Sequence, residues 1–238
     1  MRPEGTAPRL SVVIPVFNEA HTIDEIIHRV SRAPLDLDRE IVVVDDRSTD
    51  GTLERLEKLT AETSSAMRVI THERNRGKGA AVRTGIAHAG GDIVLIQDAD
   101  LEYDPRDFPA LLEPILEGQA DVVFGNRFHG GPHRVLYFWH YVANRFLTSL
   151  TNIVTGLNLS DMEVGYKVFR ADVLRRITLQ SERFGFEPEI TIKVARLRCR
   201  VYEVPIRYYG RTYEEGKKIG LKDAFQAMFC IVRFWMTD

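Results

Sequence analysis

Short apolar runs alternate with segments of helical periodicity through the first 126 residues of the chain. The apolar runs, which predict strands, are residues 10–17, 40–46, 67–70, 93–98 and 121–125. Between them, apolar positions recur every three to four residues and predict helices at 22–31, 77–89 and 111–118. Strands separated by helices indicate an α/β fold with a doubly wound, mostly parallel sheet. Thr22 and Glu25 match a capping box at the start of the first helix.

The alternation weakens beyond residue 126, so we expect a more irregular C-terminal part. Helical patterns cover residues 134–157 and 188–200, and strands are expected at 167–170 and 201–209. Neither an internal repeat nor a low-complexity linker divides the sequence. We therefore predict one compact domain over residues 1–238.

The final segment combines an apolar run with flanking lysines. Residues 221–236 form an amphipathic helical pattern that includes Trp235, and Lys217, Lys218 and Lys222 lie close to its start. This pattern suits a helix in the headgroup layer of a membrane, or one that packs on the domain or on a second copy of the chain. No segment has the roughly 20 apolar residues that span a bilayer, so a membrane link would be peripheral.

Aromatic residues gather near the start of the helical pattern at 134–157. They are Tyr137, Phe138, Trp139 and Tyr141. Such a group could line an apolar groove, but an aromatic helix face is more often part of the core. We therefore expect these side chains to be buried.

Charge is distributed unevenly along the chain. Residues 1–126 hold 14 Lys and Arg against 23 Asp and Glu, whereas residues 127–238 hold 18 against 11. An acidic half with metal ligands and a basic half facing an anion would produce this difference, as would ordinary solvated faces. The basic residues are scattered and match no nucleic-acid-binding motif, so we expect no nucleic-acid partner.

The cysteine content and the N-terminus suggest a cytoplasmic protein. Cys199 and Cys230 are the only cysteines, with neither metal-ligand spacing nor a disulfide framework, which is typical of a reducing compartment. Residues 1–9 are polar and lack the apolar core of a signal peptide. We therefore expect a cytoplasmic location.

One apolar run ends abruptly in two carboxylates, Asp98 and Asp100. A buried parallel strand would bring them to the carboxyl edge of the sheet, where open α/β sheets bind their ligands. Carboxylate oxygens in this arrangement can hold Mg²⁺ or Mn²⁺ against a diphosphate. The alternative interpretation is a polar turn after a strand.

Two other strands end in polar residues that should lie beside this pair. The loops at 15–19 and 45–46 could surround one nucleotide together with Asp98 and Asp100. The first loop lacks the Gly-x-Gly-x-x-Gly pattern of dinucleotide binding, and residues 77–80 lack the spacing of a P-loop. These exclusions leave a nucleotide bound through its base, with a metal on its diphosphate.

Several segments resemble, in order and spacing, the family 2 glycosyltransferases of the GT-A fold. They are VIPVFNE at 13–19, VVDDRSTDGT at 43–52, NRGKG at 75–79 and DAD at 98–100. Within that family the chain is similar to the polyprenyl-phosphate glycosyltransferases, which include dolichol-phosphate mannose synthases and undecaprenyl-phosphate sugar transferases. This similarity rests on GNR at 125–127, DMEVGYKVFR at 161–170, VPI at 204–206, Arg211 and the lysines at 217–218.

The resemblance implies a role for each of several residues. Around the base and ribose it places Pro15, Phe17, Glu19, Val44 and Asp46. At the ribose, the diphosphate and the metal it places Gln97, Asp98, Ala99 and Asp100. Glu102 departs from the pattern, because dolichol-phosphate mannose synthases usually have a metal-contacting Gln there, and we expect it to be an extra acidic metal ligand. It directs Arg127, Arg211 and Lys217 or Lys218 at phosphate groups, and it makes Asp98, Asp100, Arg127 and Arg211 the catalytic residues.

The implied reaction is a metal-dependent, inverting sugar transfer from a donor of the GDP-mannose or UDP-glucose type to dolichyl or undecaprenyl phosphate. It would occur at the cytoplasmic face of a membrane, with residues 10–126 binding the nucleotide sugar and 127–238 binding the acceptor. A homodimer is compatible with this arrangement. One alternative is a hydroxyl acceptor in polysaccharide or cell-envelope glycan synthesis, with Asp161, Glu163 or Glu187 as general base. Another is a non-catalytic nucleotide-sugar sensor or scaffold.

Overall fold

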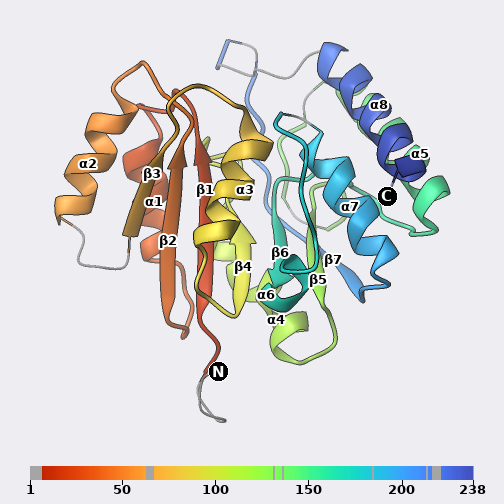
Figure 1. The fold of residues 1–238 in the computed structure, drawn as a ribbon, viewed down its shortest axis with the longest axis horizontal. Coiled ribbons are helices and arrows are strands. Elements are labelled where there is room, and N and C mark those ends of the chain that lie inside the picture. The colour runs from red at the N-terminus through yellow and green to blue at the C-terminus, as the bar shows by residue number, and fades with distance from the viewer. Residues whose placement is uncertain are drawn as a thin grey trace.

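A seven-stranded sheet forms the centre of the described part of the chain (Figure 1). The computed structural model describes residues 7–62, 67–130, 132–135, 137–183, 185–212, 214–215 and 221–237. The strands are β1 (Leu10–Val16), β2 (Arg39–Asp45), β3 (Met67–Thr71), β4 (Ile93–Ile96), β5 (Val122–Asn126), β6 (Lys167–Arg170) and β7 (Val201–Pro205). Their order is β3-β2-β1-β4-β6-β5-β7, and β6 pairs antiparallel with both of its neighbours. The predicted doubly wound, mostly parallel α/β sheet is confirmed.

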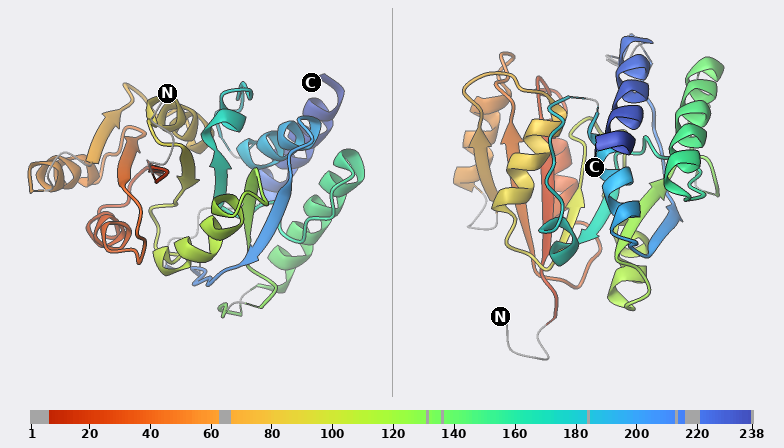
Figure 2. Two further views of the ribbon diagram at one scale, coloured as in Figure 1. Left: turned by 90° about the horizontal axis from the view of Figure 1, so that it is seen from below. Right: turned by 45° about the vertical axis from the view of Figure 1, so that its right-hand side comes forward.

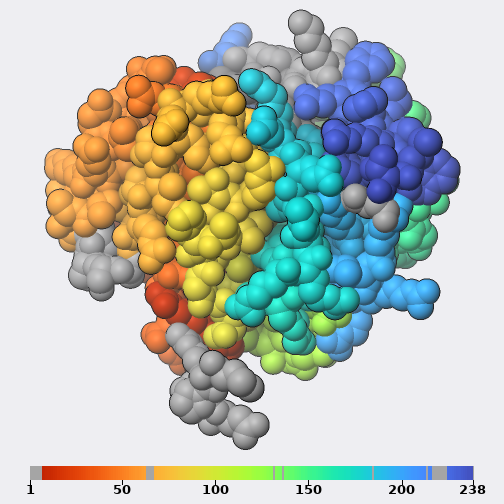
Figure 3. Space-filling model, viewed as in Figure 1, coloured from red at the N-terminus to blue at the C-terminus, as the bar shows by residue number. Residues whose placement is uncertain are grey.

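Helices cover both faces of this sheet (Figure 2). They are α1 (Ile23–Ser31), α2 (Thr52–Glu62), α3 (Lys78–His88), α4 (Phe108–Leu116), α5 (Phe138–Thr155), α6 (Ala171–Leu174), α7 (Phe186–Arg196) and α8 (Leu221–Thr237), with a 3-10 turn η1 (Pro105–Asp107) before α4. Helix α3 packs on β1 and β2 from one side, and α1 and α4 lie on the other side. The space-filling view shows α2 and α8 on opposite sides of the molecule (Figure 3).

The apolar runs form strands because helices cover both faces of the sheet. Strand β4 is buried along its whole length and β1 along nearly all of it, as expected for parallel strands between two helical layers. Helix α1 buries Ile23, Ile26, Ile27 and Val30, which lie on one helix face. Each such aliphatic side chain contributes roughly 1.5–3 kcal/mol when fully buried. This layered core fixes the edge of the sheet from which the functional loops emerge.

Strand β1 lies between β2 and β4, which brings three strand ends to one edge. Val16 is the Cα partner of Asp45 in β2, and Val13 is the Cα partner of Ile96 in β4. All three strands are parallel, so the loops that follow them emerge side by side. The predicted clustering of these loops is therefore confirmed.

The predicted capping box at the start of α1 is wrong. The Thr22 hydroxyl donates a hydrogen bond to Oε2 of Glu19 at 2.9 Å, and Thr22 makes no side-chain capping bond. Glu25 instead accepts from Nε of Arg29 at 2.6 Å. The backbone of Thr22 lies in the right-handed helical region (φ -116°, ψ -22°) and not in the extended conformation usual for an N-cap residue, so its hydroxyl accepts no hydrogen bond from the first turn.

Several predicted boundaries also differ. Strand β4 ends at Ile96, and the following residues already form the loop that carries Asp98. Strand β7 ends at Pro205, because Tyr208 makes only isolated bridges. Helix α7 begins earlier and ends earlier than predicted, at Phe186 and Arg196.

Helices α5 and α8 pack side by side and expose apolar side chains (Figures 1 and 2). The exposed apolar residues are Phe138, Trp139, Tyr141, Val142, Phe146 and Ile153 of α5, and Phe225, Phe229, Val232, Trp235 and Met236 of α8. The expectation that the aromatic group of α5 is buried is wrong, since Trp139 is 75% exposed. None of the helices in the described ranges has the length and apolar character needed to cross a membrane.

Candidate functional site

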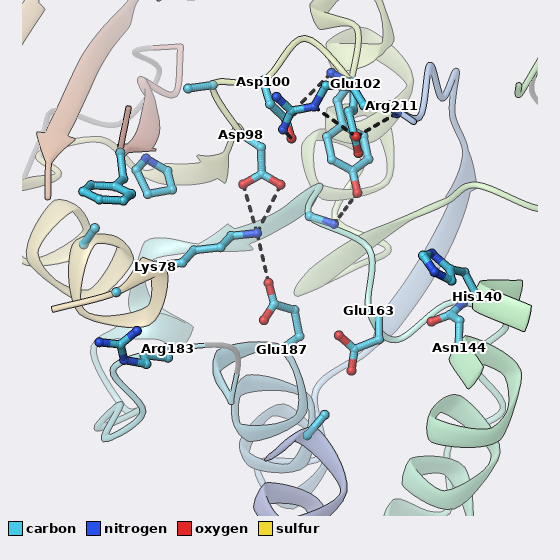
Figure 4. A pocket seen from close by; sticks show the side chains of 18 of the residues that line it. Lys78, Asp98, Asp100, Glu102, His140, Asn144, Glu163, Arg183, Glu187 and Arg211 are labelled. Carbon is cyan, nitrogen blue, oxygen red and sulfur yellow. Dashed lines mark hydrogen bonds and ion pairs between the residues drawn. The ribbon is translucent and has the colours of Figure 1, made fainter. Parts of the chain in front are cut away.

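A cavity of about 840 Å³ opens at the edge where β1, β2 and β4 end (Figure 4). The predicted site residues that line it are Pro15, Phe17, Glu19, Asp46, Asp98, Ala99, Asp100, Glu102, Arg127 and Arg211. Further lining residues include Lys78, Asn144, Glu163, Arg183, Glu187 and Tyr208. The fold thus brings together residues from the three strand ends, from α3 and from the C-terminal half.

Two predicted residues lie behind the cavity wall. Val44 and Gln97 are fully buried and are not among the lining residues. Oε1 of Gln97 accepts a hydrogen bond from the Tyr166 hydroxyl at 2.6 Å, and its Nε2 donates to the carbonyl of Asp98 at 3.0 Å. Gln97 therefore supports the loop that follows β4. Lys217 and Lys218 lie outside the described residues.

Asp46 organises the segment in front of α3. Its carboxylate accepts hydrogen bonds from the backbone N–H groups of Arg76 at 2.9 Å and Gly77 at 2.6 Å. Nδ1 of His72 lies 2.7 Å from the same carboxylate. These bonds fix the start of α3 against the end of β2. A direct contact between Asp46 and a nucleotide stays a prediction.

Lys78, the first residue of α3, links carboxylates from two walls of the cavity (Figure 4). Its Nζ lies 2.9 Å from Oδ1 of Asp98 and 3.0 Å from Oε1 of Glu187. Burial alone would lower the pKa of Lys78, but the two carboxylates hold it well above its usual range. We did not predict Lys78 as a site residue, although its position between two glycines at a predicted helix start was an available signal.

Arg211 bridges the other two acidic residues of the loop after β4 and Glu19. Its Nη2 lies 2.9 Å from Oδ2 of Asp100, its Nε 3.3 Å from Oε1 of Glu102, and its Nη1 3.6 Å from Oε2 of Glu19. Burial, together with the charges of Asp98 and Glu102, raises the pKa of Asp100 to about 7 against the opposing effect of Arg211. Negative charge is therefore crowded at this point, which favours a cation.

Asp98, Asp100 and Glu102 are the residues that could contribute to a divalent metal site. Their carboxylate oxygens are donors of the type that Mg²⁺ and Mn²⁺ prefer. Among the residues that the structure describes, no group of three or more His, Cys, Asp or Glu is arranged to hold an ion by itself. The donor set therefore fits an ion that one or two carboxylates share with the phosphates of a substrate, which is the usual mode for Mg²⁺.

Gly165 leaves the space that the Asp98 carboxylate needs. A Cβ atom at this position would lie 2.2 Å from Oδ2 of Asp98 and 2.8 Å from a ring carbon of Tyr103. The Gly165 N–H donates to the Tyr103 hydroxyl at 2.8 Å. The segment before β6 thus packs directly under the acidic loop after β4, and only glycine permits this approach.

Arg127 is held in place by a bidentate pair with Asp161. Nε and Nη2 of Arg127 each lie 2.7 Å from an oxygen of Asp161. Asp161 is fully buried and also accepts from Nδ2 of Asn144 at 3.0 Å. The guanidinium lies over the ring of Tyr208, 5.1 Å from its centroid. Arg127 is therefore a fixed positive group on the cavity wall, and both Asp161 oxygens are engaged.

Sequence comparison finds relatives that match most of the chain. The family model described as "Glycosyl transferase family 2" matches residues 11–178. The chain is 33% identical over 223 residues to undecaprenyl-phosphate mannosyltransferase from Micrococcus luteus, covering 89% of this chain and 88% of that protein. It is 30% identical over 237 residues to dodecaprenyl-phosphate galacturonate synthase from Rhizobium johnstonii, covering 95% of this chain and 67% of that protein.

Some relatives are considerably longer than this chain. Dolichol-phosphate mannosyltransferase from Pyrococcus furiosus is 31% identical over 228 residues, which cover 94% of this chain but only 63% of that protein. Among solved structures, glucosyl-3-phosphoglycerate synthase from Mycobacterium tuberculosis in complex with Mn²⁺, UDP-glucose and phosphoglyceric acid matches with a TM-score of 0.73 at 23% identity. This match covers 99% of this chain and 85% of that one, and it agrees with the fold described above.

Proposed function

The chain belongs to glycosyl transferase family 2, and on this premise we propose that it transfers a sugar from a nucleotide-sugar donor to a polyprenyl phosphate. The cavity is the observation that carries this proposal. It connects the acidic strand-end loops with a wall formed by α5 and α8, whose apolar lining residues are Trp139, Ala143, Leu147, Ala224 and Ala227 and whose polar ones are His140 and Asn144. A strongly charged end for a diphosphate thus leads into a mostly apolar end for a lipid.

The donor would bind at the polar end. Pro15 and Phe17 lie at the end of β1 and would contact the base, while Asp98 and Asp100 would face the diphosphate. Mg²⁺ or Mn²⁺ bound at these carboxylates would neutralise the leaving diphosphate. The donor would be of the GDP-mannose or UDP-glucose type. Residues 10–126 would mainly bind the donor and residues 127–238 mainly the acceptor.

The transfer would be a direct displacement. An oxygen of the acceptor phosphate attacks the anomeric carbon, and the bond from that carbon to the donor diphosphate breaks, so its electron pair leaves with the diphosphate. This attack inverts the anomeric configuration. The attacking oxygen is already ionised near neutral pH, so no general base is needed. The guanidinium groups of Arg127 and Arg211 would bind phosphate oxygens and align the two substrates.

The acceptor chain would leave the cavity between α5 and α8. Ala143, Ala224 and Ala227 line this part of the cavity, and their small side chains leave room for a prenyl chain. Other apolar side chains of the same two helices, among them Phe146 and Phe229, are exposed and do not line the cavity. We include in the proposal that this face lies on the cytoplasmic surface of a membrane, with the chain attached peripherally.

A hydroxyl acceptor is the second candidate, and Glu163 is the observation that favours it. Burial and the nearby Glu187 raise the pKa of Glu163 to about 8. A carboxyl group with a pKa close to neutrality suits a general base, which a hydroxyl acceptor requires. The other two candidate bases are engaged, because Asp161 binds Arg127 and Glu187 binds Lys78.

A transfer assay tests the proposal. Radiolabelled GDP-mannose or UDP-glucose is incubated with Mg²⁺ or Mn²⁺ and with either a short polyprenyl phosphate or a soluble glycan. We expect label in the organic phase only with the polyprenyl phosphate, and none with Asp100→Asn. Label on the soluble glycan alone would favour the second candidate, and full activity of Asp100→Asn would contradict the role of the acidic loop.

A further inference from the structure

The carboxylate of Glu102 binds a short segment that follows β7, residues 208–211 (Figure 4). Its Oε1 accepts hydrogen bonds from the backbone N–H of Arg211 at 2.9 Å and from Nε of the same residue at 3.3 Å. Its Oε2 accepts a hydrogen bond from the Tyr208 hydroxyl at 2.9 Å. The Glu102 side chain is only 13% exposed, so both oxygens of a largely buried carboxylate are engaged by this one segment.

A tight turn places Glu102 beside Asp100. Leu101 between them lies in the left-handed region, with a φ of 61°, and Oδ1 of Asp100 accepts a hydrogen bond from the Glu102 N–H at 3.1 Å. A leucine in this region is uncommon and persists only where the surrounding structure holds it. The turn brings both carboxylates to one guanidinium, since Oδ2 of Asp100 lies 2.9 Å from Nη2 of Arg211.

Glu102 and Asp100 contact different donors of Arg211. Glu102 binds the backbone N–H and Nε, whereas Nη2 lies at Asp100 and Nη1 lies 3.6 Å from Oε2 of Glu19. The two Nη groups carry most of the donors of a guanidinium, and the carboxylates that they meet line the cavity. Glu102 therefore fixes the stem of Arg211 and leaves the donors that suit a phosphate on the cavity side.

Side-chain contacts, not backbone pairing, hold the Arg211 guanidinium. The backbone pairing reaches Tyr209, whose N–H donates to the carbonyl of Glu102 at 2.9 Å. Within the described ranges, the guanidinium contacts only the carboxylates of Glu19, Asp100 and Glu102. Asp100 is also expected to face the diphosphate of a donor, so its contact with Arg211 can be exchanged when a donor binds. Glu102 is then the anchor that remains.

From these contacts we propose that Glu102 is a positioning residue. Its carboxylate anchors residues 208–211 on the loop after β4 and so places the Nη groups of Arg211 for the phosphate groups of the substrates. This task differs from that of an extra metal ligand, which the sequence led us to expect for Glu102. The assignment of Arg211 to phosphate rests on the proposed function, whereas the anchoring does not.

Hydrogen exchange of the protein without metal or substrates tests the anchoring. Deuterium uptake of residues 208–212 is followed by mass spectrometry in Glu102→Ala and in Tyr208→Phe, which removes only the hydroxyl. Tyr209→Phe is the matched control, because the Tyr209 hydroxyl lies 3.5 Å from Nη2 of Arg106 and Tyr209 does not line the cavity. Uptake in β1 reports whether each variant is folded.

We expect residues 208–212 of Glu102→Ala to exchange at least about tenfold faster than in the wild type, as for the loss of a hydrogen bond to a charged group. Tyr208→Phe should exchange at least about threefold faster, because it loses one hydrogen bond to the same carboxylate. Tyr209→Phe should match the wild type. Exchange in β1 should be the same in all four proteins.

Transfer kinetics at saturating Mn²⁺ separate positioning from metal binding. The KM for a polyprenyl phosphate should rise at least about tenfold in Glu102→Ala, with kcat within about threefold of the wild type. Tyr208→Phe should raise the same KM by a smaller factor. Glu102→Gln keeps an acceptor oxygen for the Arg211 N–H and should recover part of the loss. If Glu102 were instead a metal ligand, excess Mn²⁺ would restore Glu102→Ala, and Tyr208→Phe would behave as the wild type.

Unchanged exchange of residues 208–212 in Glu102→Ala, or wild-type kinetics of this variant in excess Mn²⁺, would overturn the inference. Faster exchange in both Glu102→Ala and Tyr208→Phe would uphold the anchoring. A wild-type protein that transfers no sugar to a polyprenyl phosphate would overturn the proposed function and the phosphate role of Arg211, but not the anchoring. The inference and the proposed function can therefore fail separately.

Discussion

Replacement of Lys78 by methionine removes the one ammonium that the structure places between Asp98 and Glu187. The three side chains are 23%, 17% and 6% exposed, so the pair is largely shielded from water. Removing one partner of a buried ion pair typically costs about 3–5 kcal/mol, because the remaining charge is left uncompensated. Two carboxylates lose their partner here, so we expect a loss of unfolding free energy of at least about 3 kcal/mol at neutral pH.

The assay is urea-induced unfolding followed by circular dichroism. Lys58→Met is the matched control, because Lys58 and Glu62 are 3.9 Å apart and 77% and 61% exposed. Such an exposed pair contributes at most about 0.5 kcal/mol. The double variant with Glu187→Gln should recover part of the loss, since it removes one of the two uncompensated charges. A Lys78→Met protein within about 1 kcal/mol of the Lys58→Met protein would refute the role that we assign to Lys78.

Three further predictions concern space, protonation and the exposed apolar face. Gly165→Ala places a Cβ against Asp98, so transfer activity should fall at least about tenfold, with a stability loss of about 1–3 kcal/mol in urea unfolding; normal activity would contradict the close approach. The pKa of Glu163 is raised by burial to about 8. The folded protein then keeps a proton that the unfolded chain releases. The unfolding free energy of the wild type should therefore fall relative to that of Glu163→Gln by up to about 1.4 kcal/mol for each pH unit between about pH 5 and 8. The same pH dependence of the unfolding free energy in both proteins would contradict this prediction. Phe229→Asp should reduce flotation with anionic vesicles, and unchanged flotation would argue against a membrane contact at α8.

The sheet and the acidic edge could be predicted because their signals are local. Continuous apolar runs are typical of strands buried on both faces, and parallel strands bring their carboxyl ends together. For that reason Asp98 and Asp100 were expected at the correct edge. Asp46 and Arg127 were expected at the same edge, and both line the cavity.

Long-range contacts explain what could not be predicted. Thr22 makes its hydrogen bond to Glu19 outside the helix, which a capping pattern within the helix cannot reveal. Trp139 is exposed because α5 packs at the end of the molecule beside α8, a placement that periodicity does not specify. Lys78 gains its role from Glu187, a residue far away in the sequence.

The central claim is that the nucleophile is a polyprenyl phosphate. The most direct measurement compares sugar transfer to a polyprenyl phosphate with transfer to the polyprenol of the same chain length, under identical donor and Mn²⁺ concentrations. We predict radiolabelled lipid only with the phosphate, because the ionised phosphate oxygen attacks without a general base and Arg127 and Arg211 bind it. Equal or faster transfer to the polyprenol would contradict the account.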